Sequence, residues 1–160
     1  MELDLKINRE VVPVTERILD EKQEQSVELD YVLPDYEPDV FRVFGCEICP
    51  TVVRRTLGTD RISYELRADI RILYCSSDSY FLQCVTQQMT FSRSVELPRP
   101  VDQPQITIRP KTTYGNCRAV SPRRLEVRGA VAIAVTVTGD RHQEVIRDVF
   151  GMHMQLKKSP

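Results

Sequence analysis

The chain has 160 residues, 41% of them hydrophobic, which is enough to bury the core of one domain or of two small halves that share a core. Its 22 basic and 23 acidic residues leave a net charge of -1, which argues against nucleic acid or an anionic membrane as a partner. Neither a secretory signal nor an apolar run of membrane-spanning length is visible, so we expect a cytoplasmic protein with no membrane span.

Residues 1–30 are predicted to be a strand-forming arm. Apolar and polar residues alternate over 3–7 and again over 27–31, which is the period of a strand. Pro13 fits an edge strand or a bulge, and residues 20–25 are expected to be a polar connector. The sequence leaves open whether the arm pairs with its own sheet or with that of a neighbouring molecule.

The segment YVLPDYEPDVFRVFG at 31–45 interrupts this alternation. Pro34 and Pro38 enclose a small acidic turn, because proline favours turns and cannot continue a central strand. The Asp39 carboxylate could accept hydrogen bonds from the first free N–H groups of a helix. One short helical turn is therefore predicted at 39–44.

The acids of this segment, Asp35, Glu37 and Asp39, allow other interpretations. Neighbouring carboxylates can act as a general acid and base, and alternating oxygen ligands are typical of calcium loops. Neither a nucleophile nor an oxyanion donor accompanies them, so turn and cap chemistry explains the acids better. Phe41 and Phe44 are expected to anchor the turn on the core.

A duplication follows the motif. Two half-repeats run over about 46–97 and 105–154, and a proline-rich linker at 97–104 separates them. Each half-repeat contains an Ile-x-Pro strand (48–50 in the first, 108–110 in the second), a polar loop, a long strand, a turn and a return strand. Repeated units of this size commonly bury one face against each other.

The long strand differs between the two half-repeats. Residues 66–74 place apolar side chains on one face only, whereas residues 127–137 are apolar on both faces, which indicates a central strand or one covered by a second sheet. Residues 138–140 (TGD) predict a hairpin turn, and a return strand would then reach Met152. We predict an all-β domain over 31–160, a β-sandwich or open barrel built from two related halves.

Three features in order resemble the SPOCS domain family of clostridial spore-coat proteins. They are the segment PDYEPDVFRV at 34–43, a long strand that ends at Tyr74, and a return strand that ends at Ser92. The resemblance covers about residues 26–150. The motif and core anchors that it implies are Pro34, Asp35, Pro38, Asp39, Phe41, Phe44 and Tyr74.

The resemblance implies a non-enzymatic structural and protein-interaction module of the bacterial endospore coat. Such a protein is made in the cytoplasm of the sporulating mother cell and ends in the coat or at the spore surface. The implied partners are spore-coat proteins, including the ATPase of the coat's basement layer, and copies of itself. The alternative is a fibre or appendage subunit of the spore surface that donates residues 1–19 as a strand to the next subunit. Neither interpretation needs catalytic residues, a cofactor or a metal.

The five cysteines, an odd number, do not form a closed disulfide framework. Cys46 and Cys49 form a CxxC motif that could hold zinc or cycle as a dithiol, but the sequence lacks the second ligand pair of a structural zinc site. Ordinary packed thiols are the favoured interpretation. If the assembly is oxidised outside the cell, Cys46, Cys49 and Cys117 are the candidates for disulfides between subunits.

Overall fold

The computed structural model describes the backbone of residues 6–78 and 81–150, and the side chains of residues 10–78 and 81–140. The expected all-β class is confirmed, because these residues form strands joined by turns and short connections, without a helix. In chain order the strands are β1 (Lys6–Val32), β2 (Val40–Leu57), β3 (Arg61–Ser76), β4 (Leu82–Glu96), β5 (Gln105–Ser121) and β6 (Arg124–Phe150).

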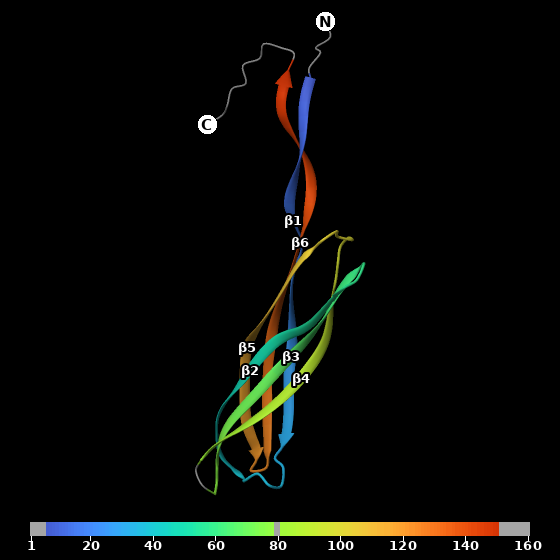
Figure 1. Cartoon of the computed structure of the whole chain (residues 1–160). Coiled ribbons are helices and arrows are strands. Elements are labelled where there is room, and N and C mark those ends of the chain that lie inside the picture. The colour runs from blue at the N-terminus through green and yellow to red at the C-terminus, as the bar shows by residue number, and fades with distance from the viewer. Residues whose placement is uncertain (1–5, 79–80, 151–160) are drawn as a thin grey trace, which may run out of the picture.

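The strands form two three-stranded antiparallel sheets with the orders β2-β3-β4 and β1-β6-β5. The sheets lie against each other as a sandwich and do not close into a barrel (Figure 1). β3 and β6 are the central strands, as the apolar pattern of residues 127–137 predicted for β6. The expectation of a β-sandwich is therefore confirmed.

The core lies between the inner faces of β3 and β6. Alternate residues of β3 from Ile62 to Tyr74 are buried, which confirms the two-residue period predicted for 66–74. Alternate residues of β6 from Leu125 to Val137 are buried in the same way. Each central strand buries one face completely because it has a neighbour on both sides and a second sheet below.

The second apolar face of β6 is small and points away from the core. Ala130, Ala132 and Ala134 pair in register with Ser26, Glu24 and Lys22 of β1, on the outer face of the sheet. Long side chains flank two of these alanines in register, Glu24 and Lys111 beside Ala132, and Lys22 and Arg109 beside Ala134. Their apolar stems can cover the alanines without a second sheet. The apolar pattern thus correctly identified a central strand, although no sheet formed by the described residues packs on its second face.

Close packing of the two sheets requires a glycine in β6. A Cβ atom at Gly129 would lie 2.5 Å from the side chain of Ile48 in β2 and 2.7 Å from the carbonyl oxygen of Tyr114 in β5. Both distances are shorter than real carbon contacts, so only glycine lets Ile48 reach across to the other sheet.

The two half-repeats do not each form a complete sheet. β2, β3 and β4 form one sheet, but the other takes its third strand from the N-terminal arm. The hairpin turn predicted at 138–140 is wrong, because β6 continues through these residues, paired with 15–17 of β1. The arm already occupies the free edge of β6, so the expected return strand is replaced by a longer β6; its predicted end, Met152, lies outside the described residues.

The arm itself is one continuous strand. Residues 20–25 are not a connector, because they pair with residues 131–136 of β6. Their polar side chains suit an edge strand, one side of which meets solvent. Residues 97–104 do form the predicted linker between β4 and β5, without strand pairing.

The helical turn predicted at 39–44 is also wrong. β2 begins at Val40, and its register with β3 skips Phe41 and Phe44, which are the extra residues of two β-bulges. A bulge breaks the alternation of side chains, so Phe41 is 63% exposed and Phe44 is 55% exposed. Neither phenylalanine anchors the segment in the core, contrary to the expectation from sequence.

Candidate interaction surfaces

The first candidate surface is a two-stranded extension of the sandwich, here called the ribbon. It consists of residues 6–16 of β1 and 139–150 of β6 (Figure 1). These residues lie beyond β5, because β5 begins at Gln105, which pairs with Thr138. Within the described residues, both edges of the ribbon therefore lack a backbone partner. Two strands alone are marginally stable, and unpaired edges are templates for further strands.

The second candidate surface lies on the outer face of β2-β3-β4, near the start of β2. Phe44, Leu73 and Cys84 line a shallow depression there, together with the charged side chains of Glu47 and Arg71; its volume is ≈ 340 Å³. Phe44 and Leu73 are both exposed. The result is a small apolar patch at one end of an otherwise polar sheet surface.

Arg123, which sequence reasoning missed, organises the acidic segment. Its guanidinium donates hydrogen bonds to the carbonyl oxygens of Leu33, Pro34 and Glu37. It also forms an ion pair with the Asp39 carboxylate, at 3.2 Å between nitrogen and oxygen. The planar guanidinium can serve several acceptors at once, so one side chain fixes the whole turn.

Backbone hydrogen bonds hold the segment on both sides of this arginine. The N–H of Leu33 donates to the carbonyl of Arg123, and the N–H of Val40 donates to the carbonyl of Pro122, each at 2.9 Å. The polar loop of the second half-repeat was visible in the sequence, but nothing there indicated which of its arginines faces the acidic segment. That choice is made by the approach of the two sheets.

The remaining motif residues form the predicted turn without a cap. The N–H of Glu37 donates to the carbonyl of Pro34 at 2.9 Å, which closes a turn. Asp35 is exposed and Pro38 is half-buried. Because no helix follows, Asp39 is not a cap, and its carboxylate pairs with Arg123 instead.

Tyr74, the last of the predicted anchors, is completely buried at the end of β3. Its hydroxyl is the buried side-chain polar atom for which the described residues provide no hydrogen-bond partner. Burial raises the pKa of Tyr74, and the nearby carboxylate of Glu37 raises it further. The ring contributes to the core, but the buried hydroxyl forms no hydrogen bond with the described residues that would offset its loss of contact with water.

The CxxC motif cannot form a single metal site in this fold. Cys46 and Cys49 lie on strand β2, where residues three apart point to opposite faces. Cys46 packs against the core, whereas Cys49 pairs in register with Asp69 on the outer face. Accordingly, no group of three or more metal-binding side chains converges within the part of the chain that the structure describes.

The structure brings together two of the three predicted bridging cysteines, within one chain. Cys46 of β2 and Cys117 of β5 both pack against the core, where these edge strands of the two sheets run side by side. Burial, followed by a hydrogen bond with Cys46, raises the pKa of Cys117 to about 12. Burial and a hydrogen bond with Glu47 also raise the pKa of Cys49. All of these cysteines are free thiols.

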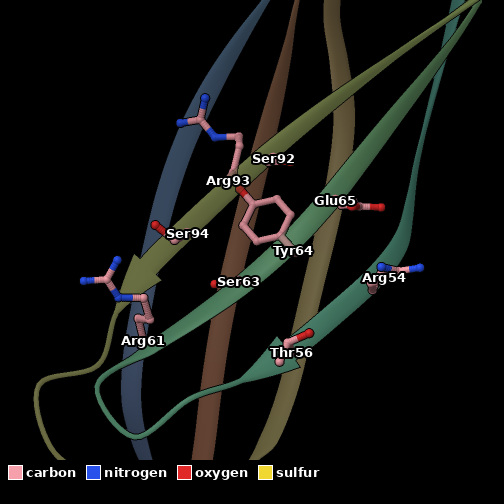
Figure 2. Close-up of a pocket in the computed structure, with 9 residues that line it drawn as sticks. All are labelled: Arg54, Thr56, Arg61, Ser63, Tyr64, Glu65, Ser92, Arg93 and Ser94. Carbon is pink, nitrogen blue, oxygen red and sulfur yellow. The ribbon is translucent and has the colours of Figure 1, made fainter.

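A polar depression of ≈ 430 Å³ lies at the other end of β2-β3-β4 (Figure 2). Thr56, Ser63 and Ser94 form a row of hydroxyls across the three strands. Arginines and Glu65 flank this row. The lining contains neither histidine nor cysteine, so it offers hydrogen bonds but no evident nucleophile with its base.

None of the described residues belongs to a helix that could cross a membrane. No protein-family model matches the chain, and neither a curated protein nor a solved structure shows significant similarity to it.

Proposed function

We propose that this protein is a non-enzymatic structural and interaction module that binds protein partners, including copies of itself, through exposed β surfaces. The observation that carries the proposal is the ribbon, which projects beyond both sheets and whose outer backbone edges have no strand partner among the described residues. Unpaired edges offer main-chain hydrogen bonds to an incoming strand, and exposed apolar side chains such as Val11 add burial on contact.

The proposed setting is the bacterial endospore coat, which rests on the resemblance of the PDYEPDVFRV segment to the SPOCS family. On this proposal the protein acts first in the mother-cell cytoplasm and then in the coat or at the spore surface. Its partners are spore-coat proteins, including the basement-layer ATPase. A fluorescent fusion expressed in sporulating cells should form a ring around the forespore; a signal that stays diffuse throughout sporulation would contradict this setting.

A matched pair of substitutions tests the role of the ribbon. Val11 lies in the ribbon and Val32 lies at the other end of the same strand, and each is 58% exposed. Val11→Lys should weaken self-association, because a charge is costly at an apolar contact. Light scattering across a concentration series should show this as a lower average molar mass of the particles in solution. Val32→Lys should leave the mass unchanged.

Two outcomes would count against the proposal. If the wild-type protein is monomeric at every concentration, the proposed self-association is wrong. Equal effects of the two lysines would show that association does not depend on the ribbon. Circular dichroism of both variants should match the wild type, since both positions are exposed edge-strand positions.

The second candidate, a fibre subunit that donates its N-terminal strand, is favoured by the position of residues 6–16. In the described part of the chain, the backbone of these residues pairs with β6 of the same chain, beyond the reach of β5. Strand donation therefore requires that they leave β6 and pair with β6 of the next subunit. Cysteines introduced at Thr15 and Asp140, which pair in register, distinguish the two cases. Oxidation should give a disulfide within each monomer if residues 6–16 remain paired with β6 of their own chain, and covalent multimers if they pair with β6 of the next subunit. Oxidised wild-type protein is the control.

A further inference from the structure

The four edge strands of the sandwich differ in how well they are protected against pairing. β1, β2 and β5 each contain a proline, at Pro13, Pro50 and Pro110, and each takes part in a ladder with register shifts. Proline removes an N–H donor and bulges distort the edge, so both discourage a further strand. β4 contains no proline, and its ladder with β3 runs from Arg61 to Cys75 without a shift.

β4 also lacks the charges that commonly protect an edge. Residues 82–92 (LQCVTQQMTFS) contain no charged side chain, and Arg93 and Glu96 are the charged residues of the strand. Arg93 is already engaged, because its guanidinium donates to the side-chain oxygens of Gln23 and Gln25 in β1. A regular edge without proline or charged side chains is the type of edge that accepts another strand.

The sandwich is closed on one side and open on the side of β4. On the closed side the Thr112 hydroxyl of β5 donates to the carbonyl of Ile48 in β2 at 2.7 Å. On the open side, the hydrogen bonds between β1 and β4 within the described residues involve the end of β4, at Arg93 and Ser94. Residues 82–92 of β4 have no such link to the other sheet in the described part of the chain.

The inner face of β4 is incompletely covered as a consequence. Met89 and Phe91 pack against the core but are only partly buried, whereas the equivalent positions of β3 are fully buried. A strand added beyond β4 would cover these two side chains as well as the backbone edge. The edge therefore offers both main-chain hydrogen bonds and apolar area to a partner.

We propose that the edge of β4 pairs antiparallel with β4 of a second copy, which joins two three-stranded sheets, β2-β3-β4, into one continuous sheet. Self-pairing suits this edge because a two-fold contact brings the same residues together, and residues 82–92 carry no charge that would repel its equivalent. Outward side chains such as Thr86 and Gln88 can then hydrogen-bond across the junction. This inference rests on the proposed function as a self-associating module and adds the edge of β4 to the ribbon as a second surface for association.

Thr86→Lys tests the proposal, with Thr107→Lys as its matched control. Both threonines are exposed on edge strands, but Thr107 belongs to β5, which has a proline and lies beside β2. Lysine at 86 should raise the dimer dissociation constant about tenfold or more, because a two-fold contact places the charge there twice. Lysine at 107 should leave the constant unchanged, and both variants should keep the wild-type circular dichroism spectrum. In wild type, hydrogen exchange at residues 82–92 should slow as concentration rises.

The failure of this proposal can be distinguished from that of the proposed function. One result would overturn the β4 edge alone: a wild-type protein that dimerises, whose dimerisation is abolished by Val11→Lys and is unchanged by Thr86→Lys. Self-association through the ribbon would then stand. If wild type remains monomeric at all concentrations, self-association through either surface is overturned. Unchanged exchange at residues 82–92 in a protein that does dimerise would also overturn the assignment to β4.

Discussion

Tyr74 has a ring that lies in the core as expected and a hydroxyl without a hydrogen-bond partner among the described residues. Its ring is completely buried in the core, as expected of an anchor, and Glu37 of the acidic segment lies close enough to influence its hydroxyl. Its hydroxyl has no hydrogen-bond partner among the described residues, although it is completely buried. An unsatisfied buried hydroxyl costs free energy, so the ring stabilises the fold and the hydroxyl opposes it.

Removing that hydroxyl should not harm the protein. Tyr74→Phe is expected to leave the free energy of unfolding unchanged or to raise it by up to about 1 kcal/mol, because the unsatisfied group is removed. Tyr74→Ala, which also removes the ring, should lower it by about 3–5 kcal/mol. Denaturant titration measures both. A clear loss of stability in Tyr74→Phe would mean that the hydroxyl has a partner in solution.

The cysteines should differ in reactivity according to their surroundings. Cys84 is exposed on β4, whereas the pKa of Cys117 is raised to about 12 by burial and by its hydrogen bond with Cys46. Since the thiolate is the nucleophile, iodoacetamide at pH 8 should modify Cys84 well before Cys117, as peptide mass spectrometry would measure. Equal rates at the two positions would contradict the packing of Cys117.

The same shift predicts a pH dependence of stability. The pKa of Cys117 is about 12 in the folded protein, above its ordinary value of 9.0. The folded state therefore holds this proton more tightly than the unfolded state. Its contribution to the free energy of unfolding is fully present below pH 9 and is lost as the pH rises from about 9 towards 12. Cys117→Ser should weaken this alkaline decline, measured as the unfolding midpoint against pH.

Among the elements, the acidic segment depends on an interaction between distant parts of the chain. Residues 33–39 have few regular hydrogen bonds of their own, and Arg123, from the turn between β5 and β6, supplies most of those that fix their carbonyl groups. The segment was expected to support itself through a helical turn. Its conformation is instead decided by the other sheet, because the arginine reaches it only when the sandwich is assembled.

Arg123→Met should therefore loosen the segment while leaving the strands in place. We expect the free energy of unfolding to fall by about 2 kcal/mol, since several hydrogen bonds to a charged group are lost. Limited proteolysis should show faster cleavage within 34–39. The control is Arg118→Met, because Arg118 forms one exposed ion pair with Glu126, and such pairs contribute little. Equal cleavage of the two variants would contradict the role of Arg123.

The bulges and edges of the strands are also features that the sequence pattern reveals only in part. Phe41 and Phe44 are exposed because each is an extra residue in β2, and the period of two cannot reveal where such a residue is inserted. Prolines mark β1, β2 and β5 as edge strands, and the sequence indicated this for Pro13. β4 contains no proline, and its residues 82–92 contain no charge. That this leaves an unprotected sheet edge is visible only once the structure shows which strands are its neighbours.

At the scale of the whole molecule, the first and last strands pair along almost their full length. This pairing completes the second sheet and produces the ribbon, whose tip lies at the start of β1 and the end of β6 (Figure 1). The ribbon and the β4 edge are separate surfaces. Val11→Lys and Thr86→Lys should therefore act independently if both contribute to association.

The sequence by itself determined the all-β class, the central position of β6 and the linker at 97–104, because alternation, length and proline are local signals. It also identified Tyr74 as a core anchor. Only the tertiary structure decided which strand completes the second sheet, where the bulges lie, and which arginine holds the acidic segment. Each of these depends on competition between distant segments for the same edge or the same acceptors, and pattern within a single segment cannot record the outcome of that competition.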